Sequence, residues 1–128
     1  MKPVLLLIPG MFNTTAVWDP VVAALNSLAD APEVRVADVV PQESISAMAA
    51  DAWALVSDVP AGTPLALCGF SMGGYVALEL LAAHPGRFQA LAMVDSAAGV
   101  ETPETVVLRE KSIAALGRNF ERTVEGII

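Results

Sequence analysis

The chain has 128 residues, 55% of them apolar, with 14 acidic and 7 basic side chains for a formal net charge of −7. This length favours one domain with a real core, and the acidic balance argues against nucleic acid or an anionic membrane as a partner, because both attract clustered Lys and Arg. A single cysteine, Cys68, excludes an internal disulfide. The apolar run before Pro9 is too short for a signal peptide or a membrane span. From both observations we expect a cytoplasmic protein.

The beginning of the chain is predicted to form strand, helix and strand. Residues 4–8 are an unbroken apolar run that ends at Pro9-Gly10, as expected for a strand buried on both faces of a parallel sheet. Polar side chains can then cap a helix whose apolar residues, over 17–28, fall on one face. The β-branched stretch 34–40 predicts a second strand nearer the sheet edge.

The same alternation continues along the chain. Residues 65–68 form a short buried strand, a helix opens at Met72, and residues 88–94 form the next strand. Strands and helices that alternate in this way give right-handed crossovers, so we expect an α/β fold with a parallel, doubly wound sheet of about four strands and flanking helices. Before strand 65–68, Ser44 can cap a helix whose apolar stripe consists of Ile45, Met48, Ala49, Ala52, Leu55 and Val56.

The turn after strand 65–68 is the candidate site. Gly69, Ser71 and Gly73 match G-x-S-x-G, in which a serine sits on a strained strand-to-helix turn. A Cβ two residues to either side of such a serine would collide with backbone, which explains both glycines. Backbone N–H groups and the helix dipole there favour developing negative charge, as acyl transfer requires. The alternative is a glycine-rich turn in which Ser71 only caps the helix.

Other reactive or aromatic side chains have structural interpretations. Cys68 ends a buried strand and is interpreted as a small core residue, and Trp18 as a packing residue near a helix start. Neither Cys68, His84 nor any carboxylate cluster has the spacing of metal ligands. We therefore expect no metal and no cofactor.

The sequence changes character at residue 101. Thr102-Pro103 is a good helix start, Gly117 can end that helix, and a second helical piece spans 120–128. We interpret residues 1–100 as the N-terminal half of a core domain and residues 101–128 as the helical start of a lid over the site.

The Pro-Gly after the first strand and the Gly-Phe-Ser-Met-Gly turn together resemble the first half of the α/β-hydrolase fold, in particular small carboxylesterase-like members. The resemblance runs from Val4 to about Asp95. It implies that Ser71 is the nucleophile and that the backbone N–H groups of Met11 and Met72 form the oxyanion hole, with a small apolar ester or thioester as substrate. Serine at 71 argues against the dehalogenase and epoxide-hydrolase branches, which use aspartate.

The chain departs from this family in the rest of the catalytic triad. The family order is Ser, then Asp, then His on later strands, and this sequence ends before them. The only histidine, His84, lies about 20 Å along the helix that follows Ser71, at 1.5 Å rise per residue. Asp95 follows strand 88–94, where a minority of members place the acid, but without a histidine to orient we favour a loop-capping or lid-anchoring role.

Two classes of function therefore stay open. The chain is either a serine hydrolase whose turnover needs an absent Asp and His, or an inactive binding or oligomerising module; an acyltransferase, perhydrolase or C–C hydrolase would share the same serine. The apolar excess further suggests a truncated form in which strand 88–94 is a bare hydrophobic edge. Such a form would pair with another copy through that edge or persist only with help.

Overall fold

A computed structural model describes residues 2–127 of the chain. Residue contacts divide the chain into two compact units that meet between Ala98 and Gly99, and we describe each by itself. In chain order the elements are β1 (Val4–Ile8), the 3-10 helix η1 (Thr15–Trp18), α1 (Asp19–Asn26), β2 (Glu33–Val36), α2 (Ile45–Ala54), β3 (Leu65–Phe70), α3 (Met72–Ala83), β4 (Ala90–Val94), α4 (Pro103–Arg118) and α5 (Phe120–Ile127).

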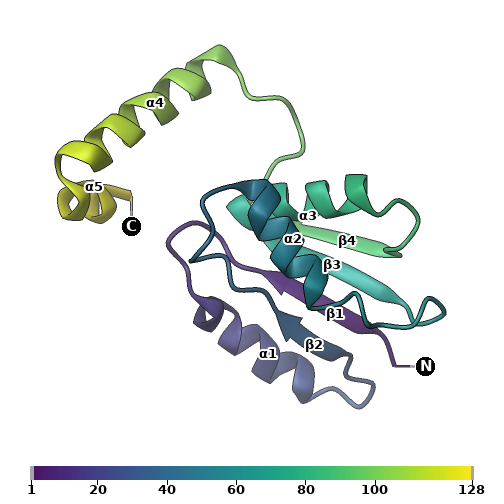
Figure 1. The fold of residues 1–128 in the computed structure, drawn as a ribbon. Helices are drawn as coiled ribbons and strands as arrows, with labels where there is room; N and C mark the ends of the chain where they lie inside the picture. Colours follow the sequence, from purple (N-terminus) through teal and green to yellow (C-terminus); the bar gives the residue numbers. More distant parts are fainter. Residues whose placement is uncertain (1, 128) are drawn as a thin grey trace. The chain divides into compact units, whose positions relative to one another are not determined.

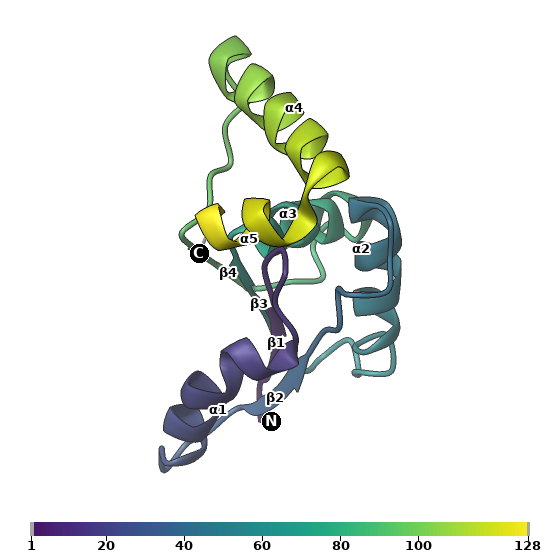
Figure 2. The same cartoon turned by 90° about the vertical axis from the view of Figure 1, so that its left-hand side faces the viewer.

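The first unit is built on a four-stranded parallel sheet in the order β2-β1-β3-β4 (Figure 1). β1 lies inside the sheet, with Leu7 opposite Val36 of β2 and opposite Cys68 of β3. β3 runs two residues beyond the predicted 65–68, because Gly69 and Phe70 still pair with β4. Helices lie on both faces of the sheet (Figure 2), which confirms the predicted α/β class with a doubly wound parallel sheet.

The hydrophobic core lies between the sheet, α2 and α3. Buried positions alternate along β3, whereas β1 is buried almost throughout, as its unbroken apolar run predicted. α2 begins after Ser44, whose Oγ accepts a hydrogen bond from the Ala47 N–H at 3.0 Å. The largest fully buried side chains of this unit are Leu6, Leu7, Ile8, Val56, Leu65, Leu67, Val76 and Leu80.

The opposite face of the sheet carries α1 (Figure 2). The apolar side chains predicted to share one face of this segment stay largely in solvent, with Val21 40% and Leu28 55% exposed. β4 is an edge strand in which every residue but the half-buried Met93 is exposed. The expected bare hydrophobic edge is therefore present, although the strand starts at Ala90 and not at the predicted residue 88.

Three further local predictions were wrong. The strand predicted over 34–40 ends at Val36, because the Asp38 carboxylate accepts the Val40 N–H at 3.0 Å and turns the chain. Leu55, assigned to the apolar stripe of α2, is 39% exposed because it lies at the C-cap, where the helix ends. Gly117 lies inside α4, which continues to Arg118 and is capped by Asn119.

The second unit consists of α4 and α5. Thr102 caps α4 by accepting the Thr105 N–H at 3.2 Å, and Pro103 occupies the first turn, so the predicted helix start is confirmed. The predicted last residue of the second helix, Ile128, lies outside the described residues. The interpretation of this segment as the start of a lid stays a prediction. Within residues 2–127, no helix is both long enough and apolar enough to cross a membrane.

Candidate active site

Ser71 lies at the junction between β3 and α3. It is the N-cap residue of α3, which begins at Met72 as predicted, and its backbone adopts φ 52° and ψ −117°. Such a conformation costs a non-glycine residue about 1–3 kcal/mol of conformational free energy. The Ser71 side chain makes no capping hydrogen bond to α3, which excludes the alternative of a simple helix cap.

Gly69 and Gly73 allow the backbone on both sides of Ser71 to pack closely. A Cβ on Gly69 would lie 2.6 Å from the backbone nitrogen of Gly74. A Cβ on Gly73 would lie 2.6 Å from the carbonyl oxygen of Pro9, just after β1. Because these neighbours are backbone atoms, they cannot swing aside for a side chain. Only glycine fits at either position without moving the main chain.

Three hydrogen bonds hold the Ser71 backbone. Its N–H donates to the carbonyl of Val94 in β4, and its carbonyl accepts from the Gly74 N–H and from Ser96 Oγ, each at 2.9 Å. A Cβ on Gly74 would collide with the Ser96 side chain, so these two residues are sterically matched. Neither was anticipated from the sequence. The two consecutive glycines at 73–74 were the only sequence feature that pointed to close packing here. Nothing in the sequence pointed to Ser96, because its hydrogen-bond partner, the Ser71 carbonyl, lies 25 positions earlier.

The loop after β1 borders the same turn. A Cβ on Gly10 would lie 3.2 Å from the Cβ of Ser71 and 3.1 Å from the Phe70 carbonyl oxygen. Met11 directly follows Gly10, and Met72 directly follows Ser71, so the structure brings the two predicted oxyanion-hole residues to the turn. Neither of their backbone N–H groups donates a hydrogen bond to another residue in the described part of the chain.

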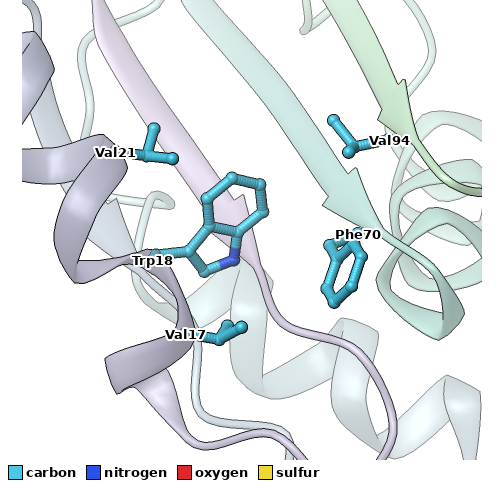
Figure 3. A pocket seen from close by; sticks show the side chains of 5 residues that line it. All are labelled: Val17, Trp18, Val21, Phe70 and Val94. Atoms are coloured by element: carbon cyan, nitrogen blue, oxygen red, sulfur yellow. The ribbon is translucent and has the colours of Figure 1, made fainter. Parts of the chain in front are cut away.

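An apolar groove of about 170 Å³ lies beside this turn, between the η1–α1 segment and the ends of β3 and β4. Trp18 and Phe70 meet edge to face across it, with ring centroids 6.4 Å apart. Trp18 is buried, as its predicted packing role requires, but its Nε1 has no hydrogen-bond partner among residues 2–127. Figure 3 shows the lining residues, which are Val17, Trp18, Val21, Phe70 and Val94.

The two other candidate triad groups do not reach a triad arrangement. His84 is the C-cap of α3, at the opposite end of that helix from Ser71, and its ring stacks on Trp53 with centroids 3.5 Å apart. The predicted separation of His84 from Ser71 is therefore confirmed. The Asp95 side chain is exposed, and its backbone adopts φ 47°. Within the described chain its carboxylate accepts no hydrogen bond, so the predicted loop-capping role is not found.

Cys68 is a half-buried residue of β3. Burial raises the pKa of its thiol, which disfavours the nucleophilic thiolate. Cys68 lies outside the cluster of buried core residues, so the predicted role as a core residue is not found, although its environment is not that of a reactive nucleophile. Among the residues that the structure describes, no group of three or more His, Cys, Asp or Glu side chains could hold a metal ion.

Comparison with protein families identifies the fold. The model of the family described as serine aminopeptidase, S33, matches residues 40–125, which is more than half of the chain. The chain belongs to the S33 family of α/β hydrolases. The resemblance to the α/β-hydrolase fold that the sequence indicated is thereby confirmed. No curated protein matches this S33 chain at a significant level.

Solved structures share the fold of this S33 chain. An esterase from a marine microorganism is 25% identical with a TM-score of 0.68, over 93% of this chain and 48% of its own. An N-formylmaleamic acid deformylase from Pseudomonas putida is 27% identical with a TM-score of 0.62, over 75% and 39%. A thermophilic esterase from Thermogutta terrifontis, with malate bound, is 24% identical with a TM-score of 0.68, over 93% and 46%. The S33 chain thus spans less than half the length of each of these proteins.

Proposed function

We propose that this S33 chain supplies the nucleophile and the oxyanion hole of a serine hydrolase that cleaves carboxylic esters or thioesters through an acyl-enzyme. The supporting observation is the strained backbone of Ser71, which has φ 52°. The glycines on either side, Gly69 and Gly73, lie so close to neighbouring backbone atoms that neither has room for a Cβ. We call residues 69–73 the nucleophile elbow. A strained serine without a capping role lowers stability, and presentation of its hydroxyl at a helix N-terminus is the function that accounts for it.

In the proposed reaction, Ser71 Oγ attacks the acyl carbonyl carbon of the substrate. The Oγ–C bond forms while the hydroxyl proton passes to a base, and negative charge develops on the carbonyl oxygen. The unpaired N–H groups of Met11 and Met72 are the proposed donors to that oxygen, assisted by the dipole of α3. The intermediate then expels the alcohol or thiol, which takes up the proton, and water hydrolyses the acyl-enzyme by the same route.

The base and the acid that orients it come, in this proposal, from outside the 128 residues. A serine hydroxyl needs a base within hydrogen-bond reach, about 3 Å. His84, the chain's one histidine, instead stacks on Trp53 at the far end of α3. This chain covers 48% of the marine esterase, so about half of that protein lies outside the matched part. A further segment or a second polypeptide is therefore the proposed source of the base.

The substrate is proposed to be small and mostly apolar. The groove beside Phe70 supports this, because all its lining side chains are apolar. Two of the similar structures are esterases, and the third, a deformylase, adds a one-carbon acyl group to the candidates. Acyl transfer, perhydrolysis and C–C hydrolysis would use the same nucleophile and stay alternatives. The reducing cytoplasm is the proposed setting, since the single thiol, Cys68, is free.

Covalent labelling of Ser71 tests this function. The chain is incubated with a fluorophosphonate probe, and its intact mass is measured beside an assay of p-nitrophenyl acetate hydrolysis. We expect one slow adduct per chain and no sustained turnover. Ser71→Ala should abolish the adduct, and Ser57→Ala, which removes an exposed hydroxyl elsewhere, should keep it. An adduct that persists in Ser71→Ala would refute the assignment of the nucleophile.

A catalytically inactive binding or oligomerising module is the second candidate. The stacking of His84 on Trp53 favours it, because the chain then has no base of its own for Ser71. The exposed edge strand β4 favours it as well, because such an edge can pair with another chain. The labelling experiment separates the two candidates, since an inactive module gives no adduct at Ser71.

A further inference from the structure

We infer that Asn13 is a further catalytic residue, whose side-chain amide group donates a third hydrogen bond to the oxyanion that forms when Ser71 attacks a substrate. This inference deepens the proposed function, which names only the backbone N–H groups of Met11 and Met72 as donors. The catalytic role rests on that proposed function, whereas the position of the Asn13 side chain does not.

The Asn13 side chain lies close to the proposed nucleophile. A Cβ built on Gly10 would lie 3.0 Å from Asn13 Oδ1 and 3.2 Å from the Cβ of Ser71. Two atoms that lie 3.0 Å and 3.2 Å from one point are at most about 6 Å apart, the sum of the two distances. The oxyanion of a tetrahedral intermediate lies three bonds from the serine Cβ, about 3 Å away, and its donors lie about 3 Å further. Asn13 is therefore within reach of the oxyanion.

The Asn13 carboxamide has no other task in the fold. Polar residues before η1 were predicted to cap a helix, and Thr14 fills this role, because its Oγ1 accepts the Ala16 N–H at 3.3 Å. Within residues 2–127 the half-buried Asn13 side chain makes no hydrogen bond. A half-turn about its Cβ–Cγ bond exchanges Oδ1 and Nδ2, so the carboxamide can present an N–H donor at the place beside Ser71.

The turn that carries Asn13 is strained. The Asn13 N–H donates to the Gly10 carbonyl at 3.2 Å, which closes a β-turn over residues 10–13. Phe12, the third residue of this turn, has φ 65°. Glycine and asparagine are the residues preferred in this conformation, and a bulky side chain there is an outlier. Strained residues of this kind cluster at functional sites. The same turn carries Met11, so its conformation sets the positions of two of the three donors.

The three donor residues border one recess. Its volume is about 220 Å³, and Met11, Asn13 and Met72 are all among its lining residues. The walls come from the loops after β1 and β2 and from α2 and α3, so this recess is separate from the groove beside Phe70. None of its lining side chains is charged. Developing negative charge can therefore be stabilised there only by dipoles, and each hydrogen bond contributes more than it would in water.

Labelling kinetics of matched asparagine variants test the role of Asn13. The rate of fluorophosphonate labelling is measured with imidazole as the base, because the phosphoryl oxygen of the probe takes the place of the oxyanion. Asn13→Ala should lower this rate about 100-fold, as the loss of one oxyanion-hole donor does. Asn13→Asp keeps the shape of the side chain without an N–H donor and should be at least as slow. Asn26→Ala removes an exposed carboxamide from α1 and should leave the rate unchanged.

An NMR titration tests the same contact without a reaction. Acetate, the acid released from an acetyl ester, is added to Ser71→Ala, and sodium chloride at equal concentration is the control. We expect acetate to move the side-chain amide signals of Asn13 and the backbone N–H signals of Met11 and Met72 with one dissociation constant. Adding Asn13→Ala should weaken acetate binding about tenfold, as the loss of a hydrogen bond to a charged group predicts. Asn13 signals that do not respond to acetate would overturn the inference, whether or not the Asn13 variants fold.

The two proposals fail through different results. If the parent chain gives no adduct at Ser71 even with imidazole, the proposed function is refuted, and a joint response of the three donors to acetate still supports their placement around one oxygen. If the parent chain gives the adduct and Asn13→Ala gives it at the same rate, the role of Asn13 is refuted and the proposed function remains.

Discussion

Replacement of Ser71 by glycine should stabilise the fold while it removes the proposed nucleophile. The Ser71 conformation, φ 52° and ψ −117°, costs a non-glycine residue about 1–3 kcal/mol and costs glycine little. The side chain makes no capping hydrogen bond, so little is lost with the hydroxyl. Glycine adds conformational entropy to the unfolded chain, which opposes the gain by about 0.5–1 kcal/mol. We therefore expect Ser71→Gly to raise the free energy of unfolding by about 1 kcal/mol, which corresponds to about 5 °C in Tm.

Thermal and urea unfolding followed by circular dichroism measure this gain. Ser71→Ala is the matched control, because it removes the hydroxyl but keeps the Cβ and therefore the strain. We expect Ser71→Ala to lie within about 0.5 kcal/mol of the parent chain. If Ser71→Gly is no more stable than Ser71→Ala, the turn is not strained, and the observation that supports the proposed function is lost.

Three further predictions concern the surroundings of the site. Gly74→Ala should lower the free energy of unfolding by about 1–3 kcal/mol, because the added Cβ collides with the Ser96 side chain. Adding Ser96→Gly to this variant should restore most of that free energy. Additive effects of the two substitutions in a double-mutant cycle would contradict the contact. Light scattering should give twice the chain mass of 13.3 kDa, because the uncharged edge strand β4 can pair with β4 of a second copy. Antiparallel pairing would bring the Arg87 end of one copy to the Asp95 end of the other. The opposite edge strand, β2, is protected from such pairing by the Arg35–Glu33 ion pair. Ala92→Lys in β4 should restore the single-chain mass, and Ala29→Lys, in the turn before β2, should not; a monodisperse parent monomer would refute the pairing. Cys68 should react with iodoacetamide more slowly in the folded than in the denatured chain at pH 8, because its raised pKa reduces the thiolate fraction, and equal rates would count against its burial.

The parts of the fold that follow short-range patterns could be predicted from the sequence. An unbroken apolar run bounded by Pro9-Gly10 has few alternatives to a buried strand, and β1 spans Val4–Ile8 as predicted. The start of α3 at Met72 follows from the glycine spacing, since the close packing at Gly69 and Gly73 requires a sharp turn there. Both features depend on residues within a few positions of one another.

The parts that could not be predicted depend on distant contacts. Helical periodicity shows that Val21 and Leu28 share a face, but it does not show whether another element covers that face, and here they are exposed. The hydrogen bond from Ser96 to the Ser71 carbonyl joins residues 25 positions apart and follows from the sheet topology. The unpaired Trp18 Nε1 likewise appears only when η1 is packed against β3.

Ser71 is proposed to be a nucleophile that lacks its base and the acid that orients the base, and imidazole-dependent labelling tests this claim most directly. The rate of fluorophosphonate labelling is measured against imidazole concentration and pH in the parent chain, Ser71→Ala and His84→Ala. We predict a single adduct whose rate rises with imidazole, falls below about pH 6.5 as the base is protonated, disappears in Ser71→Ala and is unchanged in His84→Ala. An absence of labelling at any imidazole concentration, or its loss in His84→Ala, would contradict the claim.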